Sequence, residues 1–469
     1  MTGIDNTSKF SAYRAKYPEF HYQSYHAEID DHFLKLTFSY AILGLAEFHH
    51  NLDLALKDPA TINLDSPIVQ NLIFHVGLVE LISYWKCTAS PNIIIDCGHL
   101  DEYQISWWKK LYFNGLGELF YRNGIKTTLD EFMQISCPTT APDLSVYEVS
   151  RESLDGYITL IGGGKDSVVT LETLDLDQKR DYCLIVNPKQ TTLACADLAG
   201  FSDSHLIAVH RTIDPALLEL NRQGFLNGHV PFSAMLAFVS YLAAYLFGKK
   251  YIAASNESSA NESNLPNNDP SVAQVNHQYS KSFEFEQDFN AYADRYLKTP
   301  VKYFSFLRPL NELQIAKLFS RHKKYHPVFK SCNVGSKSDP WVWCGECAKC
   351  LFAFTILSPY LYPDDLIAIF GQDLFENPRL TSLLDDLTGH GETKPFDCVG
   401  TFSEVNFALA MTISRLRAAH RPLPYLLDYY ETTYGLVSLE PNLELEYNTE
   451  NLLTPEQDTR LRQELFRHD

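Results

Sequence analysis

Three consecutive glycines, Gly162 to Gly164, followed by Lys165, Asp166 and Ser167, carry the residue types in this chain that point most directly to chemistry. An apolar, β-branched run precedes the glycines and a Val-Val-Thr-Leu-Glu-Thr-Leu segment follows Ser167, which predicts a strand, a tight loop and a helix N-terminus. Glycine lets the backbone approach a ligand and adopt positive φ. The unpaired N–H groups at the start of a helix attract an anion. The segment therefore predicts a phosphate-binding loop.

The residues around these glycines exclude two common phosphate loops. A Walker A loop has Ser or Thr after Gly-Lys, but Asp166 follows Lys165 here. A dinucleotide fingerprint has glycine or alanine three residues after Gly164, where Ser167 stands. A glycine-rich turn with a helix cap is the structural alternative. Three glycines in a row cost more backbone entropy than such a turn needs, which favours a binding role.

The same segment resembles the PP-loop of the N-type ATP pyrophosphatases, Ser-Gly-Gly-x-Asp-Ser, with Gly162 in place of the leading serine. In that family the loop holds the pyrophosphate of ATP while a substrate oxygen attacks the α-phosphorus. The resemblance implies that Asp166 helps to hold magnesium, and we hypothesise that Lys165 supplies a further countercharge. It assigns the pyrophosphate itself to Gly162, Gly163, Gly164 and Ser167.

The elements that would position this loop alternate between strands and helices. Further strands are predicted at 182–187, 206–210 and 251–254, with the longest intervening helix at 231–247. Such alternation is typical of an α/β fold with a Rossmann-like, doubly wound parallel sheet, whose ligand-binding loops gather at the carboxyl ends of the strands. We therefore expect Asn187 beside the nucleotide and Glu257 beside the substrate, because each follows one of these strands.

Four cysteines form a second motif. Cys344, Cys347 and Cys350 are spaced Cys-x2-Cys-x2-Cys, and Cys332 precedes the first of them with 11 residues between. Four thiolates can close a tetrahedral site, and we expect structural zinc here. An iron–sulfur cluster is the alternative, but Phe354 stands where a ferredoxin run would place its fourth cysteine. The clustering favours a metal over disulfides.

Polar side chains further along the chain are candidates for the substrate side of the site. The run 255–269 is too polar to pack, and we expect a mobile lid rather than inert surface. The loop 389–404, which contains Cys398, predicts a second wall of the site. A short segment between them gathers hydrogen-bonding groups that suit a polar, anionic substrate: Asn276, His277, Gln278, Tyr279 and Lys281. His277 taken alone is better explained as a hydrogen-bonded structural histidine, and only beside these neighbours does a substrate site become an equal alternative.

Composition limits the classes of function. At 469 residues we predict three parts: an N-terminal α+β domain (1–150), a PP-loop domain with the cysteines (151–356) and a helical C-terminal region (357–469). The formal net charge of −19 disfavours a nucleic-acid partner. The N-terminus has no signal pattern, and the apolar tract 234–247 falls short of the roughly 20 residues that span a membrane. We expect a cytoplasmic protein that acts on a small molecule.

Taken together, the motifs resemble the UDP-N-acetylmuramoyl-L-alanyl-L-glutamate epimerase family (MurL) over nearly the whole chain. The resemblance rests on the segments Trp107–Gly117, Gly162–Ser167, Asn227–Pro231, Asn276–Lys281 and Lys394–Gly400. The cysteine knuckle is similar to that of the 7-cyano-7-deazaguanine synthases, which are also PP-loop enzymes. Membership implies ATP- and magnesium-dependent inversion of the terminal L-glutamate of a UDP-linked muramoyl dipeptide, through a carboxyl-adenylate, in peptidoglycan synthesis.

With this resemblance, we hypothesise that His229 lies near the nucleotide and that the 276–281 side chains face the substrate. His277 and Cys398 are the hypothesised proton-transfer pair, with Asp166 on magnesium. Two other functions stay open. Other PP-loop enzymes activate a carboxylate to form an amide, a nitrile or a thiolated RNA, although the acidic composition argues against the RNA members. The non-enzymatic alternative is a zinc-stabilised module that binds ATP without cleaving it.

Overall fold

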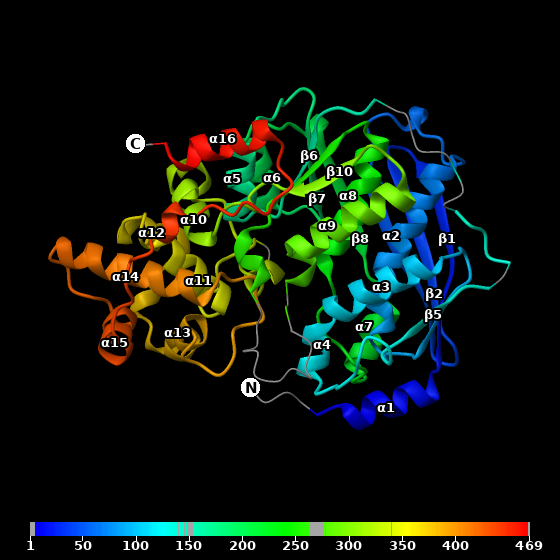
Figure 1. Cartoon of the computed structure of the whole chain (residues 1–469), viewed down its shortest axis with the longest axis horizontal. Coiled ribbons are helices and arrows are strands. Elements are labelled where there is room, and N and C mark those ends of the chain that lie inside the picture. The colour runs from blue at the N-terminus through cyan, green and yellow to red at the C-terminus, as the bar shows by residue number, and fades with distance from the viewer. Residues whose placement is uncertain are drawn as a thin grey trace. The chain divides into compact units, whose positions relative to one another are not determined.

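The computed structural model describes residues 5–138, 140–144, 147, 153–262, 276, 278–338 and 340–467. Its strands form one ten-stranded sheet in the order β10-β9-β6-β7-β8-β3-β2-β1-β4-β5 (Figure 1). The strands are β1 (Glu19–Asp30), β2 (Phe33–Ile42), β3 (Ala46–Ala55), β4 (Asn92–Ile95), β5 (Gln134–Ser136), β6 (Tyr157–Leu160), β7 (Tyr182–Val186), β8 (Leu206–Thr212), β9 (Tyr251–Ala254) and β10 (Lys302–Ser305).

Strands β6 to β10 are wound in both directions from β6. The chain runs from β6 to β7 and β8 on one side, then returns to β9 and β10 on the other. This is the strand order of a doubly wound α/β fold, in which the winding reverses between β6 and β9. The helices in these connections are α5 (Lys165–Thr173), α6 (Gln190–Leu198), α7 (Pro215–Arg222), α8 (Phe232–Leu246) and α9 (Phe283–Tyr292). The predicted Rossmann-like fold is confirmed.

Three long antiparallel strands extend this sheet beyond β8. Strand β1 pairs with β2, β2 pairs with β3, and β3 pairs with β8 from Asn51 opposite Thr212 to Leu54 opposite Val209. Strand β4 pairs in parallel with both β1 and β5. Buried residues alternate with more exposed ones along β2 and β3, because only one face of these strands packs on the core. The alternation of strands and helices predicted from the sequence does not reveal that these N-terminal strands continue the Rossmann-like sheet.

Helix α2 (Pro67–Trp85) forms the core against these N-terminal strands. It is long and apolar enough to cross a membrane, yet 89% of its apolar window is buried inside the protein, as in the core helix of a globular domain. A side chain at Gly77 would meet Tyr22, so glycine is required where α2 and β1 pack closely. The Tyr40 hydroxyl donates to the Gly77 carbonyl at 2.7 Å.

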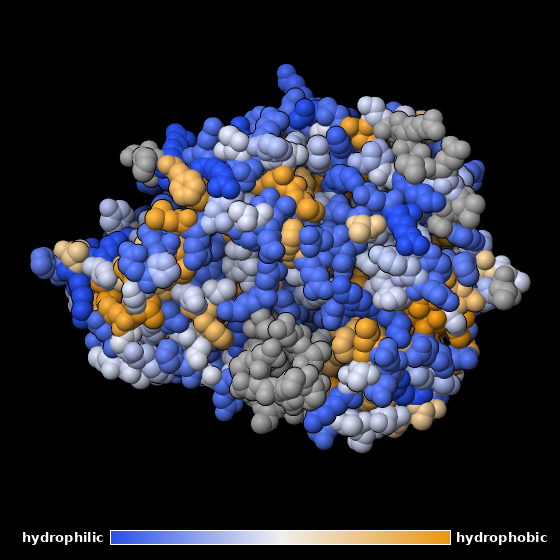
Figure 2. Space-filling model, in the orientation of Figure 1, coloured by the Kyte–Doolittle hydropathy of each residue, from blue (hydrophilic) through white to orange (hydrophobic). Residues whose placement is uncertain are grey.

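On the face drawn in Figure 2, hydrophilic residues predominate.

The aromatic segment after β4 buries much of its surface inside the first unit. It forms α3 (Glu102–Gly115) and α4 (Gly117–Arg122), with a break between Gly115 and Gly117. The side chains of Gln104 and Trp108 each donate to the Tyr292 hydroxyl oxygen at 3.0 Å. Both are buried, so their polar atoms need this shared partner.

The chain divides into two compact units that interleave along the sequence. The first comprises Met1–Ile158, Ile207–Ile252 and Asn267–Tyr303, and the second Thr159–Leu206, Ala253–Pro266 and Phe304–Asp469. The first includes α1 (Thr7–Lys16). The second includes α10 (Glu312–Arg321), α11 (Ala348–Leu357), α12 (Pro363–Phe370), α13 (Thr381–Thr388), α14 (Phe402–Ala418), α15 (Tyr425–Tyr434) and α16 (Pro455–Leu465). The division predicted from the sequence at residues 150 and 356 stays a prediction.

Candidate functional site

The glycine loop connects β6 to α5 at the point where the winding of the sheet reverses. Gly163 adopts φ +79°, and a Cβ there would lie 3.2 Å from methyl groups of Thr191 and Thr192, so this position requires glycine. Gly164 is the N-cap residue of α5 and is extended. A Cβ at Gly162 would meet nothing within 4 Å. The loop therefore leaves open space beside its first glycine, ahead of a helix N-terminus.

Lys165 and Asp166 occupy the first turn of α5 and pair with each other. The Lys165 ammonium donates to Asp166 Oδ1 at 2.5 Å and also pairs with Glu312 at the start of α10. Burial by itself lowers the pKa of Lys165, but the two carboxylates outweigh it and raise that pKa. The Lys165 side chain is only 8% exposed whereas Asp166 keeps 33%. Asp166, rather than Lys165, is therefore accessible to a ligand.

Glu312 is the centre of a buried acidic group that the sequence alone does not reveal. Burial raises its pKa to about 8, and Asp166, Glu257 and Glu404 act in the same direction while Lys165 opposes it. One ammonium close to several carboxylates leaves a negative excess, which favours a proton on Glu312. Glu404 was identifiable only as the end of a Thr-x-x-Glu capping box that begins at Thr401.

The polar segment after β9 is packed over the range 255–262, contrary to the expectation that it is too polar to pack. Glu257 is 3% exposed and its carbonyl accepts from the buried Arg308 at 2.7 Å. Asn256 donates to Ser305 at 2.9 Å, and Ser259 donates to Glu404 at 2.5 Å. Polar side chains can be buried when each finds such a partner. The rest of the predicted lid, 263–269, lies outside the described residues.

The segment that leads into the first cysteine supports the glycine loop directly. The backbone N–H of Lys330 donates to the Gly163 carbonyl at 2.9 Å. A Cβ at Gly164 would lie 3.6 Å from the Ser331 Cβ, which is ordinary contact. The Lys189 ammonium, at the start of α6, donates to the Ser336 carbonyl. The segment around Cys332 is thus hydrogen-bonded to the glycine loop at Gly163, the residue of the loop with a left-handed conformation.

The four predicted cysteines converge. Their sulfur atoms all lie within 4.8 Å of one another, and the 332–347, 344–350 and 347–350 pairs lie 3.8, 3.7 and 3.5 Å apart. A metal about 2.3 Å from four tetrahedral sulfurs sets them about 3.8 Å apart. The hydrogen bond between Cys347 and Cys350 lowers the pKa of Cys347 to about 5, which favours a thiolate. The Gly335 N–H donates to Cys332 at 3.1 Å. The group has the size and chemistry to hold a metal ion.

Comparison with known proteins adds to this geometry. The family model described as the MurL N-terminal domain matches residues 11–306, and the one described as the MurL C-terminal domain matches residues 328–427. The chain belongs to the MurL family. The family resemblance predicted from the sequence is thereby confirmed.

Three relatives of this MurL-family chain carry the name UDP-N-acetyl-alpha-D-muramoyl-L-alanyl-L-glutamate epimerase. The protein of Xanthomonas oryzae pv. oryzae is 34% identical over 358 residues, covering 74% of this chain and 75% of the relative. Those of Salinispora tropica and a Micromonospora species are 33% and 32% identical, each over 72% of this chain and over 72% and 73% of the relative. No solved structure matches the chain.

The second unit draws on both MurL domains. The glycine loop and Glu257 fall within the N-terminal match, whereas the cysteines and Glu404 fall within the C-terminal match. Glu312 lies between the two matched regions. The folded chain thus joins side chains from both domains around Lys165.

Other predicted site residues of this MurL-family chain in the second unit lie on its loops. Asn187 follows β7 in the left-handed conformation, with φ +48°, and is exposed. Cys398 is half-buried in the loop between α13 and α14. In the same loop Lys394 is buried and pairs with Glu262, which ties this loop to the segment after β9. The role of the loop as a wall of the site stays a prediction.

The remaining predicted residues belong to the first unit. His229 lies 3.9 Å from Glu118. Burial raises the pKa of Tyr279 to about 12, and its hydroxyl bonds to Asn114. The other members of this group are Asn276, Gln278 and Lys281, which lie on or beside the turn Tyr279–Lys281. His277 lies outside the described residues. The substrate-binding roles of the whole segment stay predictions.

Proposed function

We propose that this chain inverts the terminal L-glutamate of UDP-N-acetylmuramoyl-L-alanyl-L-glutamate to D-glutamate, at the expense of ATP. Membership of a family whose named members are epimerases makes the chain an isomerase. The single observation that carries the ATP-dependent part is the strand–glycine–helix corner at the reversal of the sheet, where a Rossmann-like fold binds nucleotides.

The chemistry explains why an epimerase would use ATP. The α-hydrogen of a carboxylate is hard to remove because the carbanion forms beside an existing negative charge. Attack of the carboxylate oxygen on the α-phosphorus releases pyrophosphate and gives an acyl adenylate, in which the carboxyl group no longer carries a charge and its carbonyl stabilises the carbanion. Proton removal from one face and return to the other inverts the centre. Water then cleaves the acyl adenylate, so each turnover consumes ATP and water and yields AMP and pyrophosphate.

The loop offers a distinct role to each of its residues. We assign the open space beside Gly162 and the N–H groups of the first turn of α5 to the pyrophosphate. Asp166 keeps one third of its surface exposed and is assigned to magnesium, which supplies countercharge to the phosphates. Lys165, predicted as a direct countercharge, is buried between two carboxylates. We therefore assign it to orienting Asp166.

The cysteine group is assigned to structural zinc. Four sulfurs at tetrahedral spacing, with N–H groups directed at them, suit this ion. When bound, zinc would fix a segment that has little core of its own. Through the Lys330 hydrogen bond, the same segment fixes the left-handed turn at Gly163. Its role would be to keep the ATP loop in shape rather than to act on the substrate.

Incubation of the protein with ATP, magnesium and the UDP-linked dipeptide tests the function. Epimerisation predicts D-glutamate after hydrolysis of the product, with AMP and pyrophosphate formed. A nitrogen- or sulfur-containing product would indicate another PP-loop enzyme, and binding of ATP without pyrophosphate would indicate a sensor. In deuterium oxide, the inverted product should carry deuterium at Cα.

The proton-transfer groups are tested separately, because their assignment to His277 and Cys398 rests on sequence. Cys398→Ala and His277→Ala should each stop deuterium incorporation at Cα. Adenylation, measured as the exchange of labelled pyrophosphate into ATP, should continue in both variants. Full turnover in both variants would exclude these two roles without affecting the rest of the proposal.

A further inference from the structure

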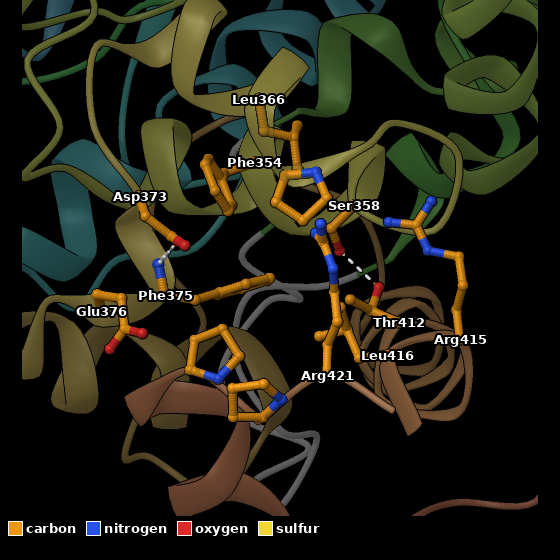
Figure 3. A pocket seen from close by; sticks show the side chains of 13 residues that line it. Phe354, Ser358, Leu366, Asp373, Phe375, Glu376, Thr412, Arg415, Leu416 and Arg421 are labelled. Carbon is orange, nitrogen blue, oxygen red and sulfur yellow. Dashed lines mark hydrogen bonds between the residues drawn. The ribbon is translucent and has the colours of Figure 1, made fainter. Parts of the chain in front are cut away.

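A cavity of about 280 Å³ lies among the helices of the second unit (Figure 3). Its apolar part includes Phe354 of α11 and Phe375 of the short helix Leu374–Glu376, whose ring centroids lie 4.9 Å apart in an edge-to-face arrangement. Three prolines and two leucines complete this surface. None of the lining residues belongs to the glycine loop, the cysteine group or the acidic group around Glu312. The function proposed above makes no use of this cavity.

Two pairs of like-charged side chains line the cavity. Asp373 and Glu376 lie on one side in Figure 3, and Arg415 and Arg421 lie on the other. Both acids and both arginines are among the described residues, and no ion pair joins one kind to the other. Burial raises the pKa of Asp373, with Glu376 adding to the effect. Burial likewise lowers the pKa of Arg415, with Arg421 adding to the effect.

The hydrogen bonds inside the cavity leave both pairs with unused capacity. Arg415 donates one N–H to the Leu361 carbonyl at 2.6 Å. Asp373 accepts the Phe375 N–H at 2.9 Å through one oxygen, and Glu376 accepts a backbone N–H at 3.3 Å through one oxygen. Within the described part of the chain, the Arg421 guanidinium has no hydrogen-bond or ion-pair partner. The fold thus places a positive and a negative group at opposite sides of an aromatic surface.

We propose that this cavity binds a free α-amino acid with an apolar side chain. The carboxylate of such a zwitterion would pair with Arg421 and Arg415, its ammonium with Asp373 and Glu376, and its side chain would pack on the two phenylalanine rings. Asp373 and Arg415 are partly buried whereas Glu376 and Arg421 are exposed, and among the described residues none of the four has an ion-pair partner of opposite charge. A ligand of opposite charge gains most at the two partly buried groups. The volume lies just below the range of about 300–1,000 Å³ typical of pockets for small molecules, which suits one amino acid and excludes a nucleotide-linked peptide.

Titration calorimetry with L-phenylalanine and L-leucine tests the proposal on the full chain. Two derivatives isolate the charges: N-acetyl-L-phenylalanine lacks the ammonium and L-phenylalanine amide lacks the carboxylate. Each should bind at least about tenfold more weakly than the parent, because each leaves one charged pair unmatched. Arg421→Met should weaken binding of L-phenylalanine by a similar factor but leave the affinity for L-phenylalanine amide almost unchanged.

Matched variants make the outcome specific. Arg417→Met removes a positive charge from α14, the helix that carries Arg415, but Arg417 is exposed, pairs with Glu431 and lies outside the cavity, so binding should not change. Asp373→Asn keeps the oxygen that accepts the Phe375 N–H. It should weaken binding of L-phenylalanine but not binding of N-acetyl-L-phenylalanine. The proposal is overturned if millimolar L-phenylalanine and L-leucine give no saturable binding, or if the neutral derivatives bind as well as the parent.

Discussion

Alanine substitutions at Gly162 and Gly163 separate the conformational role of the loop from its proposed role in binding phosphate. At Gly163 the backbone is left-handed, and an added Cβ would lie 3.2 Å from two threonine methyl groups. At Gly162 φ is not left-handed and an added Cβ would meet nothing within 4 Å. Gly163→Ala therefore strains the protein itself, whereas Gly162→Ala fills space that we assign to the pyrophosphate.

The magnitudes follow from these two environments. The left-handed conformation costs an L-residue about 1–2 kcal/mol, before any shift of the threonines is counted. If the loop must keep this conformation to bind ATP, Gly163→Ala should weaken ATP binding about 5- to 30-fold. Gly162→Ala should change the stability of the protein by less than about 0.5 kcal/mol, as at an unstrained surface position. It should nevertheless weaken ATP binding, because a methyl group stands where a phosphate oxygen approaches.

The assay is ATP binding by calorimetry in magnesium, alongside urea unfolding of each variant. Gly371→Ala is the matched control. Like Gly163, Gly371 has a positive φ, +81°, and like Gly162 it has open space where a Cβ would lie, but it is the residue that ends α12. It should lose stability as Gly163→Ala does and keep its affinity for ATP. Normal ATP binding by both Gly162→Ala and Gly163→Ala would place the triphosphate elsewhere, and the proposed adenylation would fail with it.

Three further predictions concern the groups around this loop. Lys330→Pro removes the N–H that donates to the Gly163 carbonyl and should weaken ATP binding about 2- to 10-fold, as expected for one hydrogen bond. Lys330→Ala keeps that N–H and should bind ATP normally. Equal affinities of the two variants by calorimetry would refute a role of this hydrogen bond in ATP binding. Chelation of the metal, or Cys344→Ser, should lower ATP affinity together with metal content measured by mass spectrometry, and retained affinity in metal-free protein would contradict the supporting role of the cysteines. Burial raises the pKa of Glu312 from its ordinary value of 4.5 to about 8, so the folded protein keeps a proton that the unfolded chain releases, and stability should fall as pH rises through this window. Glu312→Gln should flatten that part of the urea-unfolding profile, and an unchanged slope would exclude the assignment.

Local patterns were sufficient for the parts of this protein that depend on neighbours in the chain. The run of glycines, the Cys-x2-Cys-x2-Cys spacing and the alternation of strands and helices each depend on residues a few positions apart, and the structure has β6, α5, β7, β8 and β9 at the predicted places. The four cysteines converge as predicted, because Cys344, Cys347 and Cys350 span one loop and a helix turn. The sequence likewise carried enough of the family pattern to indicate MurL.

What the sequence could not provide is the set of partners that lie far apart along the chain. Lys165 and Glu312 are separated by 147 residues, and neither position has a local pattern that predicts their pairing. The segment after β9 is rich in polar residues and looks unpacked, yet Ser259 is buried because Glu404, 145 residues away, accepts its hydrogen bond.

The amino-acid sequence by itself determined the groups available for chemistry in this protein: a glycine-rich loop that we propose binds phosphate, four thiols that could hold a metal and a fold that places loops at one edge of a sheet. Tertiary structure alone decided that Lys165 is buried against two carboxylates and that the chain near Cys332 holds Gly163 in place. The physical reason is that backbone conformation and periodicity act over a few residues. Burial and charge, in contrast, depend on which distant segments the folded chain brings into contact.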